Sequence, residues 1–309
     1  MVKWKGALFI VVTVIVALLL SVGADVLYGY VATTKIEPPT VAHANFEYKA
    51  ENEYLGNKIY DEDGVLTSTF DVRKVLSLSA EDKLEVSIND VSKGDFVDFA
   101  DVDVSEVTIS VNGRNGRNGR NVRLVDGVNV RSAADFLYDK SKYSYLSNNL
   151  VLQNDIDLNL LPEESREVTF KMKRDIFGNG KSIISAQRTG AKARYFGVSI
   201  RFIGYGQNVV DTRFSGKTVS AGEEVVLDDF LYCGIPVEIG NGKKSDAKFV
   251  EKTKATFTNC VFENSYRNVA ISRSDVEFVR CVFNNAAEAN VSLKTTTGNN
   301  STLTFKDSV

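Results

Sequence analysis

The sequence predicts a mainly β protein whose C-terminal part is a stack of coils, and a repeated motif is the main observation behind this prediction. Phe257-Thr-Asn-Cys-Val-Phe-Glu-Asn264 returns 21 residues later as Phe278-Val-Arg-Cys-Val-Phe-Asn-Asn285. A shorter third copy, Phe305-Lys-Asp-Ser-Val309, follows 27 residues further on. Repeats of roughly 20 to 50 residues are typical of units that cannot bury their apolar face alone and stack on a neighbour. The period therefore indicates a scaffold and not a catalytic motif.

Each copy of the motif predicts a strand, a corner and a second strand. Cys260 and Phe262 are two residues apart, so their side chains point to the same side of a strand. Phe257 lies three residues before Cys260 and does not fit that alternation. The alternation therefore breaks at Asn259. Asn tolerates the left-handed backbone that a tight corner requires. We predict that Asn259 turns the corner. The predicted core ladder consists of Phe257, Cys260, Phe262, Phe278, Cys281 and Phe283.

The chain has three cysteines, an odd number that argues against a disulfide framework. Cys260 and Cys281 occupy equivalent positions of adjacent coils, which places their Cα atoms about 4.8 Å apart. That separation is within the range of a disulfide, but parallel Cβ vectors favour two buried free thiols. Cys233 lies one coil earlier.

Two further β-rich runs lie upstream, Leu152-Gln-Asn-Asp-Ile-Asp-Leu158 and Phe177-Gly-Asn-Gly-Lys-Ser-Ile183. Together with the Phe-x-Asn-Cys-x-Phe-x-Asn repeat, they make the chain resemble the right-handed parallel β-helix proteins of the pectin-lyase-like superfamily, which include adhesin-like surface repeat proteins. The resemblance covers roughly residues 131–309. It implies the fold better than the function, because that superfamily holds lyases, hydrolases, adhesins and inert spacers.

The N-terminal segment, residues 1–24, predicts export. Gly6 to Ala24 are uncharged and mostly apolar, and Lys3 and Lys5 precede them. The run is just long enough to span a bilayer as a transmembrane helix, with the short basic tail inside and the rest of the chain outside. The alternative is a cleaved signal peptide, which would make the protein secreted. Either way we expect an extracellular or periplasmic ectodomain, whose residues 25–45 form a stalk.

Residues 46–130 predict a small antiparallel β-sandwich-like domain. Its apolar residues alternate at period two, as expected for half-buried strands. They are Leu76 and Leu78; Leu84, Val86 and Ile88; Val102 and Val104; and Val107, Ile109 and Val111.

A basic Asn-Gly-Arg tract interrupts this domain and carries Arg114, Arg117 and Arg120. Asn-Gly pairs favour turns, so the tract is interpreted as a solvated loop or linker. The functional alternative is a cationic contact for an acidic polymer or for the acidic face of another copy.

Residues 131–309 predict the β-helix itself. Ser132-Ala-Ala-Asp135 has the form of a capping box and predicts a short helix, extending to about Lys140, that covers the first coil. At the other end the motif stops at Val309. Two alternatives follow: the chain is a fragment of a longer one, or copies associate end to end.

Catalytic patterns are weak throughout the sequence. Enzymes of the resembled superfamily use paired carboxylates or calcium with a basic residue, and Asp228-Asp229 superficially fits the first pattern. The motifs Gly-His-Gly, Arg-Ile-Lys and Asn-Thr-Asp are missing from the sequence, and its one histidine, His43, lies in the stalk. Gly204-Tyr-Gly206 lacks the third glycine of a dinucleotide fingerprint. We interpret Asp228 and Asp229 as turn residues and keep catalysis as the alternative.

No cofactor is predicted, with calcium as the one alternative. Asp155, Asp157 and Asn159 alternate along one strand, and oxygen ligands at this spacing suit Ca²⁺. A helix-loop-helix calcium loop would need glycine at position 160, which is Leu160.

Composition and motifs together favour a non-enzymatic, exported cell-surface protein that acts in adhesion or glycan binding. The net charge of −3 argues against a nucleic-acid partner. Expected partners are the membrane, through residues 6–24, and a polysaccharide or other cell-surface ligand. The alternative is a polysaccharide lyase or glycoside hydrolase.

Overall fold

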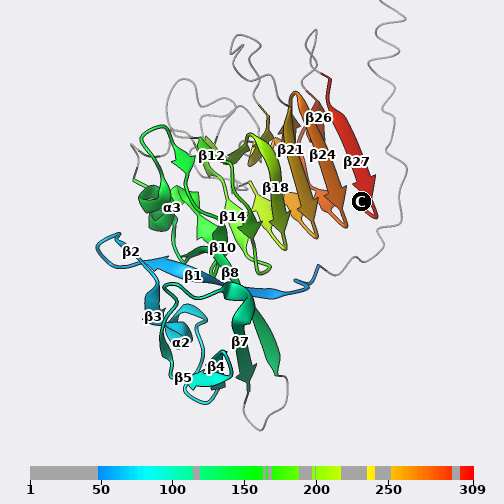
Figure 1. Cartoon of the computed structure of the whole chain (residues 1–309). Coiled ribbons are helices and arrows are strands. Elements are labelled where there is room, and N and C mark those ends of the chain that lie inside the picture. Colours follow the sequence, from blue (N-terminus) through cyan, green and yellow to red (C-terminus); the bar gives the residue numbers. More distant parts are fainter. Residues whose placement is uncertain are drawn as a thin grey trace, which may run out of the picture. The chain divides into compact units, whose positions relative to one another are not determined.

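The chain forms three sheets of short parallel strands, and each coil of the chain contributes at most one strand to each sheet (Figure 1). The computed structural model describes residues 48–113, 119–162, 165, 169–187, 197–198, 200–216, 235–240, 252–293 and 300–309. Within these ranges no helix is long and apolar enough to cross a membrane. The predicted anchor and stalk lie outside the described residues.

The first sheet runs along the whole stack, and Figure 1 shows its later strands side by side from green to red. Its parallel strands are β8 (Arg120–Val130), β10 (Leu150–Leu152), β13 (Ile176–Phe177), β18 (Tyr205–Val210), β21 (Thr253–Thr258), β24 (Ser274–Val279) and β27 (Thr302–Lys306). We call residues 128–309 the coil stack.

The second and third sheets complete each coil. The second contains β11 (Ile156–Asp157), β14 (Ser182–Ile184), β19 (Arg213–Ser215), β22 (Val261–Glu263) and β25 (Val282–Asn284). The third contains β9 (Tyr145–Leu146), β12 (Phe170–Met172), β17 (Ile200–Phe202), β20 (Val237–Ile239), β23 (Arg267–Ile271) and β26 (Ala289–Leu293). Two short strands, β15 (Ala186–Gln187) and β16 (Gly197–Val198), form a separate antiparallel pair. The arrangement is β-helix-like, in agreement with the coil prediction.

Residues before the stack form a smaller unit with its own apolar core around Leu55, Phe70, Val86 and Phe99. Its elements are β1 (Glu53–Tyr60), β2 (Leu66–Thr67), β3 (Thr69–Asp71), α2 (Val72–Val75), β4 (Lys83–Ile88), β5 (Val91–Lys93), β6 (Phe96–Asp98), the 3₁₀ turn η1 (Val104–Glu106) and β7 (Val107–Asn112). Strands β4, β5 and β7 pair antiparallel, as predicted from their alternation.

Two details of the predicted alternation are wrong. Leu76 follows a helical turn, because the Asp71 carboxylate accepts a hydrogen bond from Lys74 N (3.1 Å) and so caps α2. Val104 lies in η1, whose first turn is capped by Asp103 through Ser105 N (3.0 Å). In both places an Asp side chain competes with strand formation by bonding to the nearby backbone.

The small unit is not separated from the stack by a linker, because β8 belongs to both. Its first residues pair antiparallel with β7, and Val128 to Val130 pair in parallel with β10. Strand β1 pairs with β8 in parallel, which the predicted purely antiparallel domain did not include. One continuous sheet thus joins the two cores.

The predicted core ladder is confirmed. Phe257 stacks on Phe278 with ring centroids 5.3 Å apart, and Phe262 stacks on Phe283 at 5.0 Å. All of the ladder residues are fully buried except Phe283, which is partly buried against the same core. Parallel pairing in register places equivalent residues of successive coils one strand spacing apart, so identical side chains stack.

The cysteines of the ladder are buried free thiols, as favoured from their spacing. Cys260 donates weakly to Val209 O and Cys281 to Phe257 O. Burial raises the pKa of the Cys260 thiol, which disfavours the reactive thiolate. Cys233 lies outside the described residues.

The corner prediction is also confirmed. Asn259 has a φ of +52°, and Asn179, Asp211, Arg280 and Asp307 follow the equivalent strands of other coils with φ values between +48° and +53°. This line of left-handed residues is called the corner ladder.

A short extended segment, residues 48–56, crosses the corner ladder and is called the strap. Near its C-terminal end, Tyr54 N donates to Asn179 Oδ1 (2.7 Å) and Asn179 Nδ2 donates back to Tyr54 O (2.9 Å). Gly56 N donates to the buried side chain of Asn129 (2.8 Å). These bonds attach the strap to the first coils.

The other end of the strap reaches coils much later in the sequence. Asn259 Nδ2 donates to Lys49 O (3.0 Å), and Glu51 N donates to Asp211 Oδ1 (3.2 Å). Glu51 also forms an ion pair with Arg280 (2.8 Å). A single short segment therefore ties together coils that do not touch one another.

The first coil is covered by α3 (Ala133–Asp139), where a capping helix was predicted. The Asp135 carboxylate accepts hydrogen bonds from Arg131 N (2.6 Å) and Ser132 N (3.0 Å). Phe136 is fully buried against Phe170, with ring centroids 5.3 Å apart.

The stacked phenylalanines should dominate stability. We predict that Phe278→Ala lowers the free energy of unfolding by about 3–5 kcal/mol, because the buried ring contacts four other rings and leaves a cavity. Phe305→Ala should cost clearly less, because Phe305 stacks on Phe278 at the end of the ladder and is 49% exposed. Urea unfolding of both variants tests this, and equal losses would contradict the ladder.

The two buried thiols should be protected from reagents. In a Cys233→Ser variant, we expect Ellman's reagent to label neither Cys260 nor Cys281 in the native protein and both after unfolding, because neither thiol is exposed. Rapid labelling of the native protein would show that this part of the stack opens readily.

Candidate functional site

The turns that join the third sheet to the first form a cleft of about 610 Å³ on the coil stack. Three successive coils contribute these turns, after β9, after β12 and between β17 and β18. The lining residues are Tyr145, Leu146, Ser147, Lys173, Arg174, Gly204, Tyr205 and Gln207. The volume lies within the usual range for small-molecule and sugar sites.

The turn of the third contributing coil presents an aromatic ring to solvent. Gly204 and Gly206 have φ values of +99° and +80°, a backbone that other residues rarely adopt. Tyr205 lies between them and is 65% exposed. The ring therefore offers an apolar face to a molecule in the cleft.

Lysine ammonium groups lie over the rings of both cleft tyrosines, two over Tyr145 and one over Tyr205. Lys171 Nζ and Lys173 Nζ lie 5.1 and 4.7 Å from the centre of the Tyr145 ring. Lys254 Nζ lies 4.6 Å from the centre of the Tyr205 ring and donates to its hydroxyl oxygen (3.0 Å). That hydrogen bond raises the pKa of Lys254, which therefore stays charged. Cation–π attraction fixes the positions of these charges.

The cations at the cleft differ from those elsewhere on the stack. On other faces, arginines pair with glutamates of the next coil, as Arg213 does with Glu263 (2.8 Å) and Arg267 with Glu288. Among the described residues, no carboxylate lies within ion-pair distance of Lys171, Lys173, Arg174 or Lys254. The lining of the cleft thus includes two cations, Lys173 and Arg174, and no carboxylate, while Asp275 lies opposite Lys254 on the neighbouring strand.

Gln207 also lines the cleft, and its amide oxygen is out of contact with solvent. Gln207 is only 2% exposed, and its Nε2 donates to Ile203 O (3.1 Å). This bond fixes the amide orientation and leaves Oε1 without a hydrogen-bond partner within the described structure. A buried polar atom without a partner is unusual in a folded protein.

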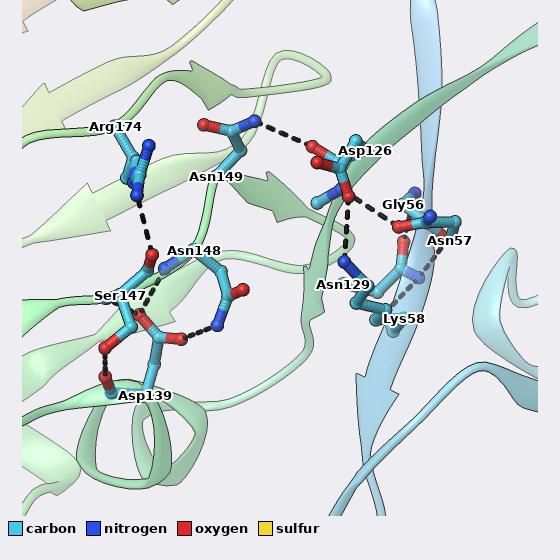
Figure 2. A network of polar contacts seen from close by, with 11 residues as sticks. Gly56, Asn57, Lys58, Asp126, Asn129, Asp139, Ser147, Asn148, Asn149 and Arg174 are labelled. Carbon is cyan, nitrogen blue, oxygen red and sulfur yellow. Dashed lines mark hydrogen bonds and ion pairs between the residues drawn. The ribbon is translucent and has the colours of Figure 1, made fainter. Parts of the chain in front are cut away.

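A polar network behind the cleft holds its first turn in place (Figure 2). The Asp139 carboxylate, 3% exposed at the end of α3, accepts from Ser147 N (2.7 Å) and from Asn148 Nδ2 (2.6 Å). Arg174 Nε donates to Ser147 O (3.3 Å) and so joins two coils. The capping helix therefore positions a wall of the cleft.

Among the described residues, none of the candidates predicted from the sequence lines this cleft. Asp228, Asp229, Arg114 and Arg117 lie outside the described residues. Arg120 is the first residue of β8 and pairs with Glu53 (3.0 Å) instead of extending from a loop.

The three residues of the calcium alternative form hydrogen bonds within turns. Asp155 Oδ1 accepts from Ser182 N (2.7 Å), and Asp157 Oδ1 accepts from Asn159 N (2.8 Å). Asn159 Nδ2 donates to Ser185 O (3.1 Å). In the part of the chain that the structure describes, no group of three or more His, Cys, Asp or Glu side chains is placed to hold a metal ion.

The sequence does not predict the cleft because its residues lie in turns and at the ends of strands β9 and β18, outside the repeated motif. The one usable signal was Gly204-Tyr-Gly206, an aromatic residue between two turn-forming glycines.

Comparison of the chain with protein-family models, with curated proteins and with solved structures finds no match. The stacked parallel strands support a β-helix-like fold, and any functional conclusion depends on the geometry of the cleft.

The network behind the cleft should make stability depend on pH. Tyr60 OH donates to Asp139 Oδ1 (2.9 Å), and burial, with the nearby carboxylate, raises the pKa of Tyr60 above its ordinary value of about 10. Because the fold favours the protonated phenol, this contribution is complete below a pH of about 10 and is lost as the pH rises further.

We predict that the free energy of unfolding falls above a pH of about 10, and that Tyr60→Phe makes this fall smaller. Urea unfolding at several alkaline pH values measures the effect. The exposed Tyr143→Phe is the control and should follow the wild type. Identical pH profiles for wild type and Tyr60→Phe would contradict the assignment.

Proposed function

We propose that this protein is a non-enzymatic surface protein that binds a glycan in the cleft between Tyr145 and Tyr205. The carrying observation is that one cleft is lined by two tyrosines, Tyr145 and the 65% exposed Tyr205, together with the polar groups of Ser147, Lys173 and Arg174. Sugars combine apolar C–H faces, which pack on aromatic rings, with hydroxyls that need hydrogen-bond partners. The cleft offers both kinds of contact.

The scaffold suits this role because it is rigid. Each wall of the cleft continues into a strand of the coil stack, and a site built on such elements keeps its geometry. We further propose that the stack is a right-handed β-helix of the pectin-lyase-like superfamily, supported by the three parallel sheets and the stacked Phe and Asn positions.

Export completes the proposal. The apolar run from Gly6 to Ala24, preceded by Lys3 and Lys5, supports a membrane anchor or a cleaved signal, with the ectodomain outside the cell. A glycan-binding face on an exported protein fits adhesion to a cell surface or to an extracellular polymer.

The test is a polysaccharide panel with the full-length chain in mild detergent. We expect at least one polymer to bind, and Tyr145→Ala and Tyr205→Ala each to weaken binding about tenfold, equivalent to about 1.4 kcal/mol. Tyr143→Ala is the matched control, because Tyr143 is 68% exposed and does not line the cleft.

Two results would overturn the proposal. The first is an equal loss of binding in the Tyr143→Ala control. The second is turnover of a polymer that Asp228→Ala or Asp155→Ala abolishes, which would establish the enzyme alternative.

A further inference from the structure

We infer that two copies of this chain pair edge to edge through β27, with the two strands antiparallel and Thr304 of each copy at the two-fold axis. Strand β27 lies at the far end of the first sheet, beside β24 (Figure 1). This surface is separate from the cleft, and the pairing does not depend on glycan binding.

Strand β27 is the longest free edge of the sheet to which it belongs. Within the described ranges, that sheet ends in three strands: β27 with five residues, β5 with three and β2 with two. A strand edge without a partner presents unpaired N–H and C=O groups to another chain, and proteins commonly keep such edges short or charged. The edges at β5 and β2 are short. The edge at β27 is longer, and Lys306 is its one charged residue.

The unpaired backbone groups of β27 belong to Leu303 and Phe305. The strand pairs in parallel with β24, and on that side Lys306 O accepts from Arg280 N (2.8 Å). Successive residues of a strand direct their backbone groups to opposite edges, so every second residue counted back from Lys306 bonds toward β24. The N–H and C=O groups of Leu303 and Phe305 therefore point to the free edge.

These groups are complementary to those of a second copy related by a two-fold axis. In an antiparallel pair, residues directly opposite each other exchange both N–H···O=C bonds at every second position. With Thr304 opposite Thr304 of the second copy, Leu303 lies opposite Phe305, and the two such pairs make four hydrogen bonds. This register places every residue of β27 opposite another residue of β27. Asp307, with a φ of +50°, turns out of the strand.

The side chains favour the same register. Leu303 and Phe305 pack against the core of the preceding coil, yet Phe305 is 49% exposed because no further strand covers it within the described structure. In the pair, Leu303 of each copy covers Phe305 of the other. On the outer face, Thr304 meets Thr304 at the axis and Lys306 lies opposite Thr302. No like charges are therefore opposed, and a Thr–Thr pair is favourable in this position.

The opposite end of the stack has no comparable edge to which β27 of another copy could pair. There, residues of β8 lie between β10 on one side and β1 on the other, and α3 covers the core of the first coil. Copies are therefore not expected to join head to tail into a filament. The association that follows from the two ends is a closed two-fold dimer.

The first experiment tests the position of Thr304 on the axis, using the full-length chain in mild detergent with Cys233→Ser. We expect Thr304→Cys to form a disulfide-linked dimer on a non-reducing gel after treatment with oxidised glutathione. Opposite residues at such a position have Cα atoms about 4.5 Å apart, within reach of a disulfide. Thr302→Cys is the matched control, because its two copies would lie about 13 Å apart and should not cross-link.

The second experiment measures the association itself by sedimentation velocity in the same detergent. We expect the dimer fraction of the unmodified chain to rise with concentration, and Thr304→Lys to weaken dimerisation at least about tenfold by opposing like charges at the axis. Leu303→Pro removes one outward N–H from each copy and leaves the bonds to β24 in place, so it should act in the same direction. Thermal unfolding checks that both variants fold.

Asn208→Lys is the matched control for the added charge. Asn208 lies in the same outward row of the sheet as Thr304, through Thr256 and Glu277, but on a strand inside the stack. Its substitution should leave dimerisation unchanged.

Three results would overturn the inference. The first is a chain that stays monomeric at every concentration. The second is equal cross-linking of Thr304→Cys and Thr302→Cys, which would exclude the register centred on Thr304. The third is a dimer that persists in both Thr304→Lys and Leu303→Pro, because the copies would then associate through another surface. None of these results bears on glycan binding in the cleft.

Discussion

The in-register stacking of parallel strands is the constraint on which the rest of this structure depends. Because equivalent residues lie one strand spacing apart, each side chain packs against an equivalent side chain of the next coil or pairs with one of opposite charge. In the core of the stack, the ring of Phe257 stacks on the ring of Phe278. At the corner, the left-handed residues form a line. On the outer faces, like charges would repel at this distance, and arginines instead face glutamates, as Arg213 faces Glu263.

The parts of the fold governed by this repetition could be predicted from the sequence, and the others could not. The ladder of Phe257, Cys260 and Phe262 and the corner at Asn259 follow from a motif seen twice. Helix α2 was missed because Asp71 forms a local cap that overrides strand alternation. The strap was missed because its partners are remote: Glu51 and Arg280 are 229 residues apart.

The cleft likewise has a part that the repeat predicts and a part that it does not. Its strands are set by the stack, but its chemistry lies at strand ends and in the adjoining turns, where Tyr145, Lys173 and Tyr205 have no repeated spacing. The sequence motifs therefore indicate carboxylates, whereas the structure brings together tyrosines, cations and an amide. The scaffold determines where such residues meet, and the turns determine what they bind.

The strap should change how the stack responds to a pulling force on the chain. In a simple solenoid each repeat contacts only its neighbours, so coils can separate one at a time from an end. Here residues 48–56 run across the corner ladder and bond to Asn179, Asp211 and Asn259 in turn. A pull on the chain at Tyr48 would act on these coils together, and they would have to shear as a group instead of peeling apart. Force applied at Tyr48 would thus be shared among coils that force applied at the last coil would separate singly.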